Sequence, residues 1–346
     1  MSNGTAMQLW SASNLVVAGL LLAGLTLLLI GRRHRLWREV FVQLRRRRPL
    51  ALLVVAGYVT VALLDSVRWV GGVDAGGDVV AQHEARSVLD RLFAGRRERS
   101  YSAPLADREF YGHAPLRHPG GHLLGTDILG RDVLLLTLKG ARVALLIGGL
   151  TSLIAIPLAL LFGVSAGYWG RRIDDGVFFV MSTLASMPTL LLLIALVMVL
   201  GRSTVAVCLA LAVTSWVGFC RLARGETFKL REMDYVQAAR ALGVSDLRIL
   251  LRHIVPNLMH LVVITFVLMF SGLVLSEAIL SWLGLGIEGS WGQMIDQARD
   301  ELSRDPAIWW NLAAAGVALF TLLLAVNFVG DAVRDILDPR TRREPT

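Results

Sequence analysis

Apolar residues in this chain gather in long blocks that polar stretches separate. Seven blocks approach the length of about 20 residues that a helix needs to cross a bilayer. They span residues 13–31, 49–66, 143–168, 177–200, 204–220, 258–283 and 307–329. Because lipid offers no hydrogen bonds, the backbone groups of each block must be satisfied within the block. The pattern therefore predicts an all-α integral membrane protein, a polytopic bundle of about seven transmembrane helices.

The composition agrees with this class. Of 346 residues, 55% are hydrophobic and only 18% are charged, whereas soluble domains carry about 25% charged residues. The net charge is +8, and nearly all the basic residues are arginines that lie in short loops. Loop arginines are typical of membrane insertion. We therefore expect membrane lipid, and no nucleic acid, among the partners.

The arginine-rich loops predict an orientation. Residues 32–48 carry eight arginines against one glutamate, which favours a cytoplasmic loop and an N-terminus outside. Alternation then places residues 67–132, 201–203 and 284–306 outside, and residues 170–175, 221–257 and the C-terminal tail in the cytoplasm. No charge precedes the first apolar block, so a cleavable signal peptide is not expected.

These blocks suggest four regions. Residues 1–66 form a two-helix region with an arginine-rich cytoplasmic loop, and residues 67–132 form an extracytoplasmic segment. Residues 133–338 form the transmembrane core, with a cytoplasmic loop at 221–257, and residues 339–346 form a cytoplasmic tail.

The cytoplasmic loop contains an amphipathic stretch, "DYVQAARALGVSDLRILLRHIVPN". Spacing places Tyr235, Ala238, Ala239 and Leu242 on one helical face. Gly243 suits the left-handed residue that ends a helix. Ser245 can cap a second helix with Asp246 in its first turn.

Pro256 is expected to begin the next span, since proline is tolerated in the first turn of a helix. The sequence thus predicts helix, sharp turn, helix. A hairpin lying on lipid headgroups is the alternative, but the small alanine face favours close approach of another protein.

The same stretch resembles the EAA loop of ABC importer permeases. Ala238, Ala239, Gly243 and Pro256 match the spacing of that pattern. Gln237 stands where the glutamate usually sits, and His253 and Val255 also depart from the pattern.

Three further stretches narrow the resemblance to the dipeptide/oligopeptide/nickel permease subfamily, and within it to the C-type permease. They are "LGTDILGRDVL" at 124–134, "SEAILSWLGLGI" followed by "SWGQMI" at 290–295, and "NFVGDAVRDILDPR" at 327–340. The resemblance implies a type I permease core, here preceded by an extra N-terminal helix.

The resemblance also implies a function and partners. The chain would be a permease subunit of an ATP-driven importer for peptides or peptide-like solutes in the bacterial cytoplasmic (inner) membrane. A second related permease, two ATPase subunits and an extracytoplasmic peptide-binding protein would complete the importer. The residues that would couple to the ATPases are Asp234, Tyr235, Gln237, Ala238, Ala239, Arg240 and Gly243.

The sequence predicts no catalytic chemistry and no cofactor. It contains no phosphate-binding loop and no hydrolase or metalloprotease motif. His113, His118 and His122 gather in the outer segment without a metal-ligand spacing, so no metal site is expected. Glu277 is ionisable within a span, which makes it a candidate for a pathway or gate role; a hydrogen bond between helices that shapes the outer half of the pore is the alternative, and the sequence slightly favours it.

Other functions remain open at this point. The chain could be a scaffold or sensor that docks a cytoplasmic partner without translocation, or the permease of a nickel-chelate importer. A secondary transporter would need more buried ion-coupling charges than Glu277 alone. The sequence does not identify the cargo.

Overall fold

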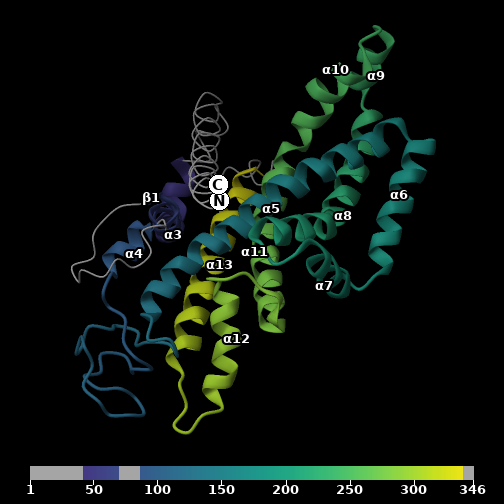
Figure 1. Ribbon diagram of the computed structural model, residues 1–346. Helices are drawn as coiled ribbons and strands as arrows, with labels where there is room; N and C mark the ends of the chain where they lie inside the picture. The colour runs from purple at the N-terminus through teal and green to yellow at the C-terminus, as the bar shows by residue number, and fades with distance from the viewer. Residues whose placement is uncertain (1–41, 70–85, 338–346) are drawn as a thin grey trace. The chain divides into compact units, whose positions relative to one another are not determined.

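The computed structural model describes residues 42–69 and 86–337 (Figure 1). The first predicted span, 13–31, and the tail, 339–346, lie outside the described residues. The chain divides into two compact units. Unit 1 comprises Met1–Leu145 and Glu288–Ala325, and unit 2 comprises Leu146–Ile287 and Val326–Thr346.

Two helices belong partly to each unit. They are α5 (Val133–Trp169) and α13 (Trp310–Leu337). At 1.5 Å per residue, the 37 residues of α5 measure about 55 Å, well beyond the ~30 Å of a bilayer core. Part of α5 must therefore lie outside the apolar layer. The predicted span, 143–168, lies wholly within the residues of α5.

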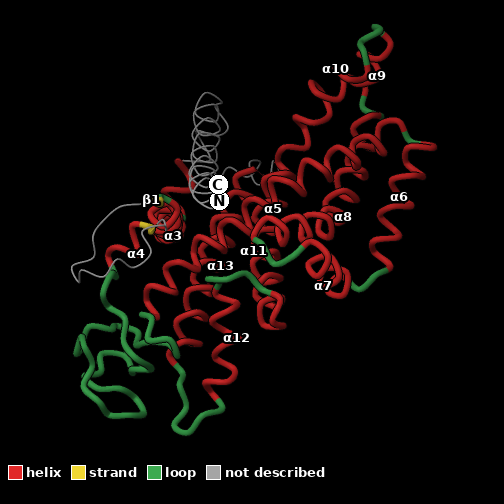
Figure 2. The backbone as a smooth tube through the Cα atoms, viewed as in Figure 1, coloured by secondary structure: helices red, strands yellow, loops and turns green. Residues whose placement is uncertain are grey.

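Unit 1 combines helices with a long irregular segment. Its other elements are α3 (Pro49–Ser66), the antiparallel two-residue strands β1 (Arg68–Trp69) and β2 (Arg86–Ser87), α4 (Val88–Leu92) and α12 (Trp291–Leu302). Figure 2 shows that the chain between α4 and α5 is almost entirely loop. The helical boundaries of α3 coincide with the predicted span at 49–66.

Buried tryptophans hold unit 1 together. The indole of Trp291 is 2% exposed and donates to the carbonyl of Thr137 at 2.8 Å. A Cβ on Gly140 would lie 2.3 Å from that indole, so only glycine allows α12 to approach α5 here. Trp310 donates to the carbonyl of Thr126 at 3.0 Å, which ties the loop segment to α13.

The described elements of unit 2 are all helices. Its elements are α6 (Arg171–Ser186), α7 (Thr189–Leu200), α8 (Thr204–Arg231), α9 (Asp234–Ala241), α10 (Asp246–Ile249), the π-helical η1 (Leu250–Ile254), α11 (Val255–Leu280) and the π-helical η2 (Ser281–Leu285).

Small residues bring α5 and α8 together in unit 2. A Cβ on Gly163 would lie 2.7 Å from the carbonyl oxygen of Cys220, and one on Gly167 would lie 2.6 Å from Thr227. The two glycines are four residues apart and so share one face of α5. Glycines at this spacing let the backbones of two membrane helices approach closely.

The apolar block at 177–200 forms parts of two helices rather than one continuous helix. Helices α6 and α7 meet at 93° across a short break. Pro188 disfavours helical geometry in the residue before it, and Met187 is extended at φ −92°, ψ 136°. Leu184, Thr189 and Thr214 help to line a cavity of about 250 Å³ beside this break. The pair is a broken span or a re-entrant segment.

Pro256 lies in the first turn of α11, as predicted, but α11 is not a separate helical run. Residues 246–285 form one helical run, and the π-helical turn η1 lies immediately before α11. Proline lacks the N–H of an α-helical bond, and the wider i→i+5 turn accommodates this interruption. The second short amphipathic helix is therefore continuous with the next span.

Within the described residues, five helices are long and apolar enough to cross a membrane, or six if α6 and α7 form one span. The five lie at Pro49–Ser66, Val133–Trp169, Thr204–Arg231, Asp246–Leu285 and Trp310–Ile336. All except the first predicted span thus have a helical counterpart.

Candidate functional site

The predicted helix–turn–helix is present in unit 2, where α8 leads into α9 and α10 leads into α11 (Figure 1). We call residues 233–251 the elbow. Helix α9 begins after Met233, an extended residue at its N-cap position. Asp234 lies in its first turn, where a negative charge is favourable.

Gly243 ends α9 in a Schellman motif. Its φ is +75°, which glycine adopts without penalty. Its N–H donates to the carbonyl of Arg240 at 3.0 Å, and the N–H of Val244 donates to that of Ala239 at 3.1 Å. These are the two bonds of the motif. The left-handed glycine predicted from the sequence is confirmed, and the geometry of the turn is fixed by hydrogen bonds.

Polar contacts anchor the elbow to the end of α5. The carboxylate of Asp246 accepts from the Tyr168 hydroxyl at 2.7 Å and from the Trp169 indole at 3.4 Å. The guanidinium of Arg240 lies over the Tyr168 ring at 5.0 Å, within range of a cation–π contact. Arg240 in α9 and Asp246 in α10 therefore contact the same residue, Tyr168. No local pattern in the sequence predicts this contact.

Ser245 takes the predicted N-cap position of α10, but its side chain makes no capping bond. The backbone carbonyl of Ser245 instead accepts from Ile249 at 3.0 Å. Asp246 lies in the first turn of α10, as predicted, and its side chain also contacts Tyr168 at the end of α5.

The predicted alanine face is divided between the core and the surface. Ala239 is buried with Val236 against Val164 and Ile249. Ala238 is exposed. The expectation that both alanines form one outer surface was wrong, because Val236 and Ala239 recur at i and i+3 and supply the inward face.

The exposed surface of the elbow includes several large apolar side chains among polar and charged ones. Leu242 is 84% exposed and Leu247 is 66% exposed. Met233, Tyr235 and Leu251 are also exposed. Single exposed apolar residues are ordinary on a protein, but a group of them on a rigid turn is typical of a docking surface.

The remaining predicted coupling residues have local partners. The amide of Gln237 donates to the carbonyl of Arg231 at 3.0 Å and reaches Glu232 at 3.4 Å. The hydroxyl of Tyr235 accepts from the Asn257 amide at 3.2 Å. Gln237 therefore helps to hold the junction between α8 and α9.

Glu277 is buried in α11, at 4% exposure. Its carboxylate accepts from the Ser281 hydroxyl, one turn further along. A Cβ on Gly286 would overlap that hydroxyl, so the residues after η2 close tightly over the pair. The partner in this bond belongs to the same helical run rather than to a neighbouring helix.

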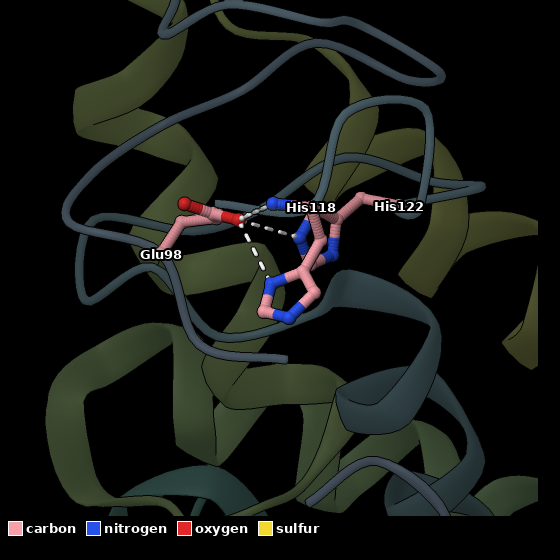
Figure 3. Close-up of side chains that lie close together, drawn as sticks. All are labelled: Glu98, His118 and His122. Atoms are coloured by element: carbon pink, nitrogen blue, oxygen red, sulfur yellow. Dashed lines mark hydrogen bonds and ion pairs between the residues drawn. The ribbon is translucent and has the colours of Figure 1, made fainter. Parts of the chain in front are cut away.

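The outer segment brings two of the three singled-out histidines together (Figure 3). His118 and His122 lie beside Glu98, which sequence reasoning missed because it is 20 residues or more upstream. His113 is not part of this cluster. Only the folded loop could reveal Glu98 as their neighbour.

Comparison with known proteins gives the elbow its context. Residues 159–343 match the family described as "Binding-protein-dependent transport system inner membrane component". The chain belongs to this family. The match contains the elbow and Glu277 but not the cluster in the outer segment. This inner-membrane component is therefore a multi-pass permease, and the predicted membrane class and permease function are confirmed.

Curated relatives agree with this assignment. The permease is 40% identical over 227 residues to a putative peptide transport system permease protein of Brucella abortus, covering 64% of this chain and 75% of the relative. It is 36% identical over 229 residues to the dipeptide transport system permease protein DppC of Bacillus subtilis, covering 64% and 70%. It is 34% identical over 226 residues to the oligopeptide transport system permease protein OppC of Haemophilus influenzae, covering 64% and 72%.

Among solved structures, the permease is similar to an inward-facing methionine ABC transporter, MetNI. The TM-score is 0.49 at 18% identity, covering 59% of this chain and 98% of that chain. The family assignment depends on the sequence relatives alone.

Proposed function

We propose that this permease forms half of the translocation pathway of an ATP-driven importer for peptides or peptide-like solutes. The relatives named above are peptide permeases, and they support this class of cargo. A second related permease, two ATPase subunits and an extracytoplasmic peptide-binding protein would complete the importer. The N-terminus would lie outside and the C-terminus in the cytoplasm.

The elbow is the surface on which an ATPase subunit docks. The observation that carries this is the strong exposure of Leu242 and Leu247, on either side of a turn that Gly243 forms and Tyr168 anchors. Burial of a leucine side chain in a partner's groove contributes roughly 1.5–3 kcal/mol. A rigid elbow would then transmit closure of the ATPases to α8 and α11 as a rigid-body movement.

Site-specific cross-linking tests the docking surface. Both native cysteines, Cys208 and Cys220, are buried, so Leu242→Cys places an accessible thiol on the elbow. In native membranes we expect this thiol to cross-link to an ATPase subunit. The matched control is Leu123→Cys, which replaces a leucine of 57% exposure in the outer segment and should form no such product.

Function is tested with Leu242→Asp in vesicles that contain the complete importer. We expect peptide uptake to fall about tenfold or more, as a loss of 1.4 kcal/mol in docking would produce, and Leu123→Asp to transport normally. If no nucleotide-hydrolysing subunit cross-links to the Leu242→Cys variant and Leu242→Asp transports at the wild-type rate, the docking role is wrong.

The cargo is tested separately. Uptake of a labelled dipeptide that depends on the binding protein would support the peptide importer. Uptake of a nickel chelate instead would favour the alternative cargo. A stable complex that moves neither solute would favour the scaffold or sensor.

A further inference from the structure

The outer segment gathers three potential metal ligands (Figure 3). Glu98 Oε1 lies 3.3 Å from His118 Nδ1 and 3.5 Å from His122 Nε2. One ligand atom from each residue lies within 4.8 Å of the others. The ligands come from two stretches of the loop between α4 and α5, so an ion held by all three would cross-link that loop.

These separations suit a tetrahedral ion. Zinc binds histidine nitrogen and carboxylate oxygen at about 2.0–2.2 Å, and a tetrahedron with such bonds has ligand-to-ligand edges of roughly 3.3–3.5 Å. The two distances from Glu98 Oε1, 3.3 Å to His118 Nδ1 and 3.5 Å to His122 Nε2, already match these edges. The His118 side chain is 44% exposed and is free to turn and shorten the third.

A buried carboxylate orients one of the histidines. His122 Nδ1 lies 2.9 Å from Asp132 Oδ2, and both side chains are at most 3% exposed. A carboxylate can only accept a hydrogen bond, so Nδ1 donates to Asp132, and Nε2 is the ring nitrogen that can bind a metal ion on the side of Glu98. Metal-binding histidines almost always donate their other N–H in this way.

Backbone hydrogen bonds hold the third ligand in place. The carboxylate of Glu98 accepts from the backbone N–H groups of Arg117 and His118 at 3.0 and 2.9 Å. Its Oε1 lies 3.5 Å from His122 Nε2, and a cation that both atoms bind fits between them.

We propose that Glu98, His118 and His122 bind one divalent transition-metal ion, for which Zn²⁺ is the best chemical match. Water would fill the fourth position on the exposed side of His118, since catalytic-type sites with three protein ligands keep one open position. Asp132 also accepts from the N–H of Leu134 at 2.8 Å, in the first turn of α5. Metal binding therefore stabilises the outer segment and its junction with α5.

Direct binding to the full chain tests the proposal, with Zn²⁺ alone as the probe. The chain is purified in detergent with an affinity tag that contains no histidine, stripped with chelator, and titrated by calorimetry. We expect one ion per chain. We also expect the X-ray absorption spectrum at the zinc edge to show two imidazole ligands and one carboxylate ligand. Zinc should also raise the thermal unfolding temperature, and a chelator should reverse the rise.

Four variants make the test specific. His118→Ala removes an exposed ring and should weaken binding about 100-fold or more without unfolding the chain; Glu98→Gln should do the same. Asp132→Asn should weaken binding about 10–100-fold, as loss of an orienting partner does. The matched control is His113→Ala in the same loop, which should bind as the wild type does. Wild-type binding no tighter than that of His118→Ala, or no zinc-dependent rise in unfolding temperature, would overturn the proposal and leave His122 as an imidazole held between two carboxylates.

Discussion

Single residues decide how the elbow is built. Gly243 has a φ of +75° and no atom near the position of a Cβ. A larger side chain at this position would meet no steric clash. The cost of replacing Gly243 is therefore backbone strain alone. A left-handed conformation costs a residue with a side chain about 1–2 kcal/mol, and more if that side chain is β-branched.

Gly243→Val should uncouple the importer. The strained turn loses its fixed angle, so we expect ATP hydrolysis by the assembled importer to persist while peptide uptake per ATP falls several-fold. Parallel measurement of phosphate release and uptake in vesicles checks this. Asparagine tolerates left-handed geometry better than other residues, so Gly243→Asn is the control and should remain nearer the wild type. Equal coupling in all three proteins would contradict the role of the turn.

A buried acid in unit 1 adds a dependence on pH. Burial raises the pKa of Glu301 above its ordinary value, against hydrogen bonds from Asn311 and Tyr101 that lower it. The native state therefore binds more protons than the unfolded state between the ordinary and the raised pKa. The stability that protonated Glu301 contributes is fully present below the ordinary carboxyl pKa. This stability is lost as the pH rises through the raised pKa of Glu301.

Glu301→Gln should remove this dependence. We expect the unfolding temperature of the variant, minus that of the wild type, to grow as the pH rises from about 4 to 8, because other titrating groups cancel in the difference. Thermal unfolding in detergent, followed by tryptophan fluorescence, measures it. A difference that stays constant across this range would show that Glu301 does not titrate there.

At the scale of helices, close approach depends on glycine. Gly163 and Gly167 of α5 pack against α8 with no room for a methyl group. Gly140 likewise leaves space for Trp291 of α12. Such contacts give α5 a separate neighbour in each unit.

Gly163→Ala should destabilise the permease. Its Cβ would press on the backbone of α8 at Cys220, and overpacking of this kind costs roughly 1–3 kcal/mol. The control is Gly149→Ala on the same helix, where a Cβ meets nothing within 4 Å and alanine is the better helix former. We expect a lower unfolding temperature only for Gly163→Ala. Equal effects in both variants would rule out the close approach of α5 and α8.

Helical periodicity predicted the elements well but their faces less well. The spacing of Tyr235, Ala238, Ala239 and Leu242 correctly indicated a helix. Which side of it faces the core depended on Tyr168 and Ile249, which belong to other elements. Pro256 lies in the first turn of α11 as expected, but a π-helical turn joins α11 to α10, so the helical run begins earlier than predicted.

At the scale of the whole molecule, the chain is one component of a larger machine. It belongs to a family of inner-membrane transport components, and its sequence contains no phosphate-binding loop. Under the proposed function, energy for transport enters from ATPase subunits that dock on the elbow. The proposed metal site lies elsewhere in the chain, in the outer segment of unit 1. Cross-linking at the elbow and zinc binding at the proposed metal site can therefore succeed or fail independently.

The sequence by itself determined the membrane class, the order of the spans and the turn at Gly243. Each of these depends on local physics: the length of an apolar block, the need to satisfy a backbone in lipid, and the freedom of a residue without a Cβ. Tertiary structure alone decided that Ala239 faces inward, and that Glu98 joins His118 and His122 while His113 does not. Those outcomes depend on contacts between residues distant in the chain, and the spacing of residues along a sequence carries no record of them.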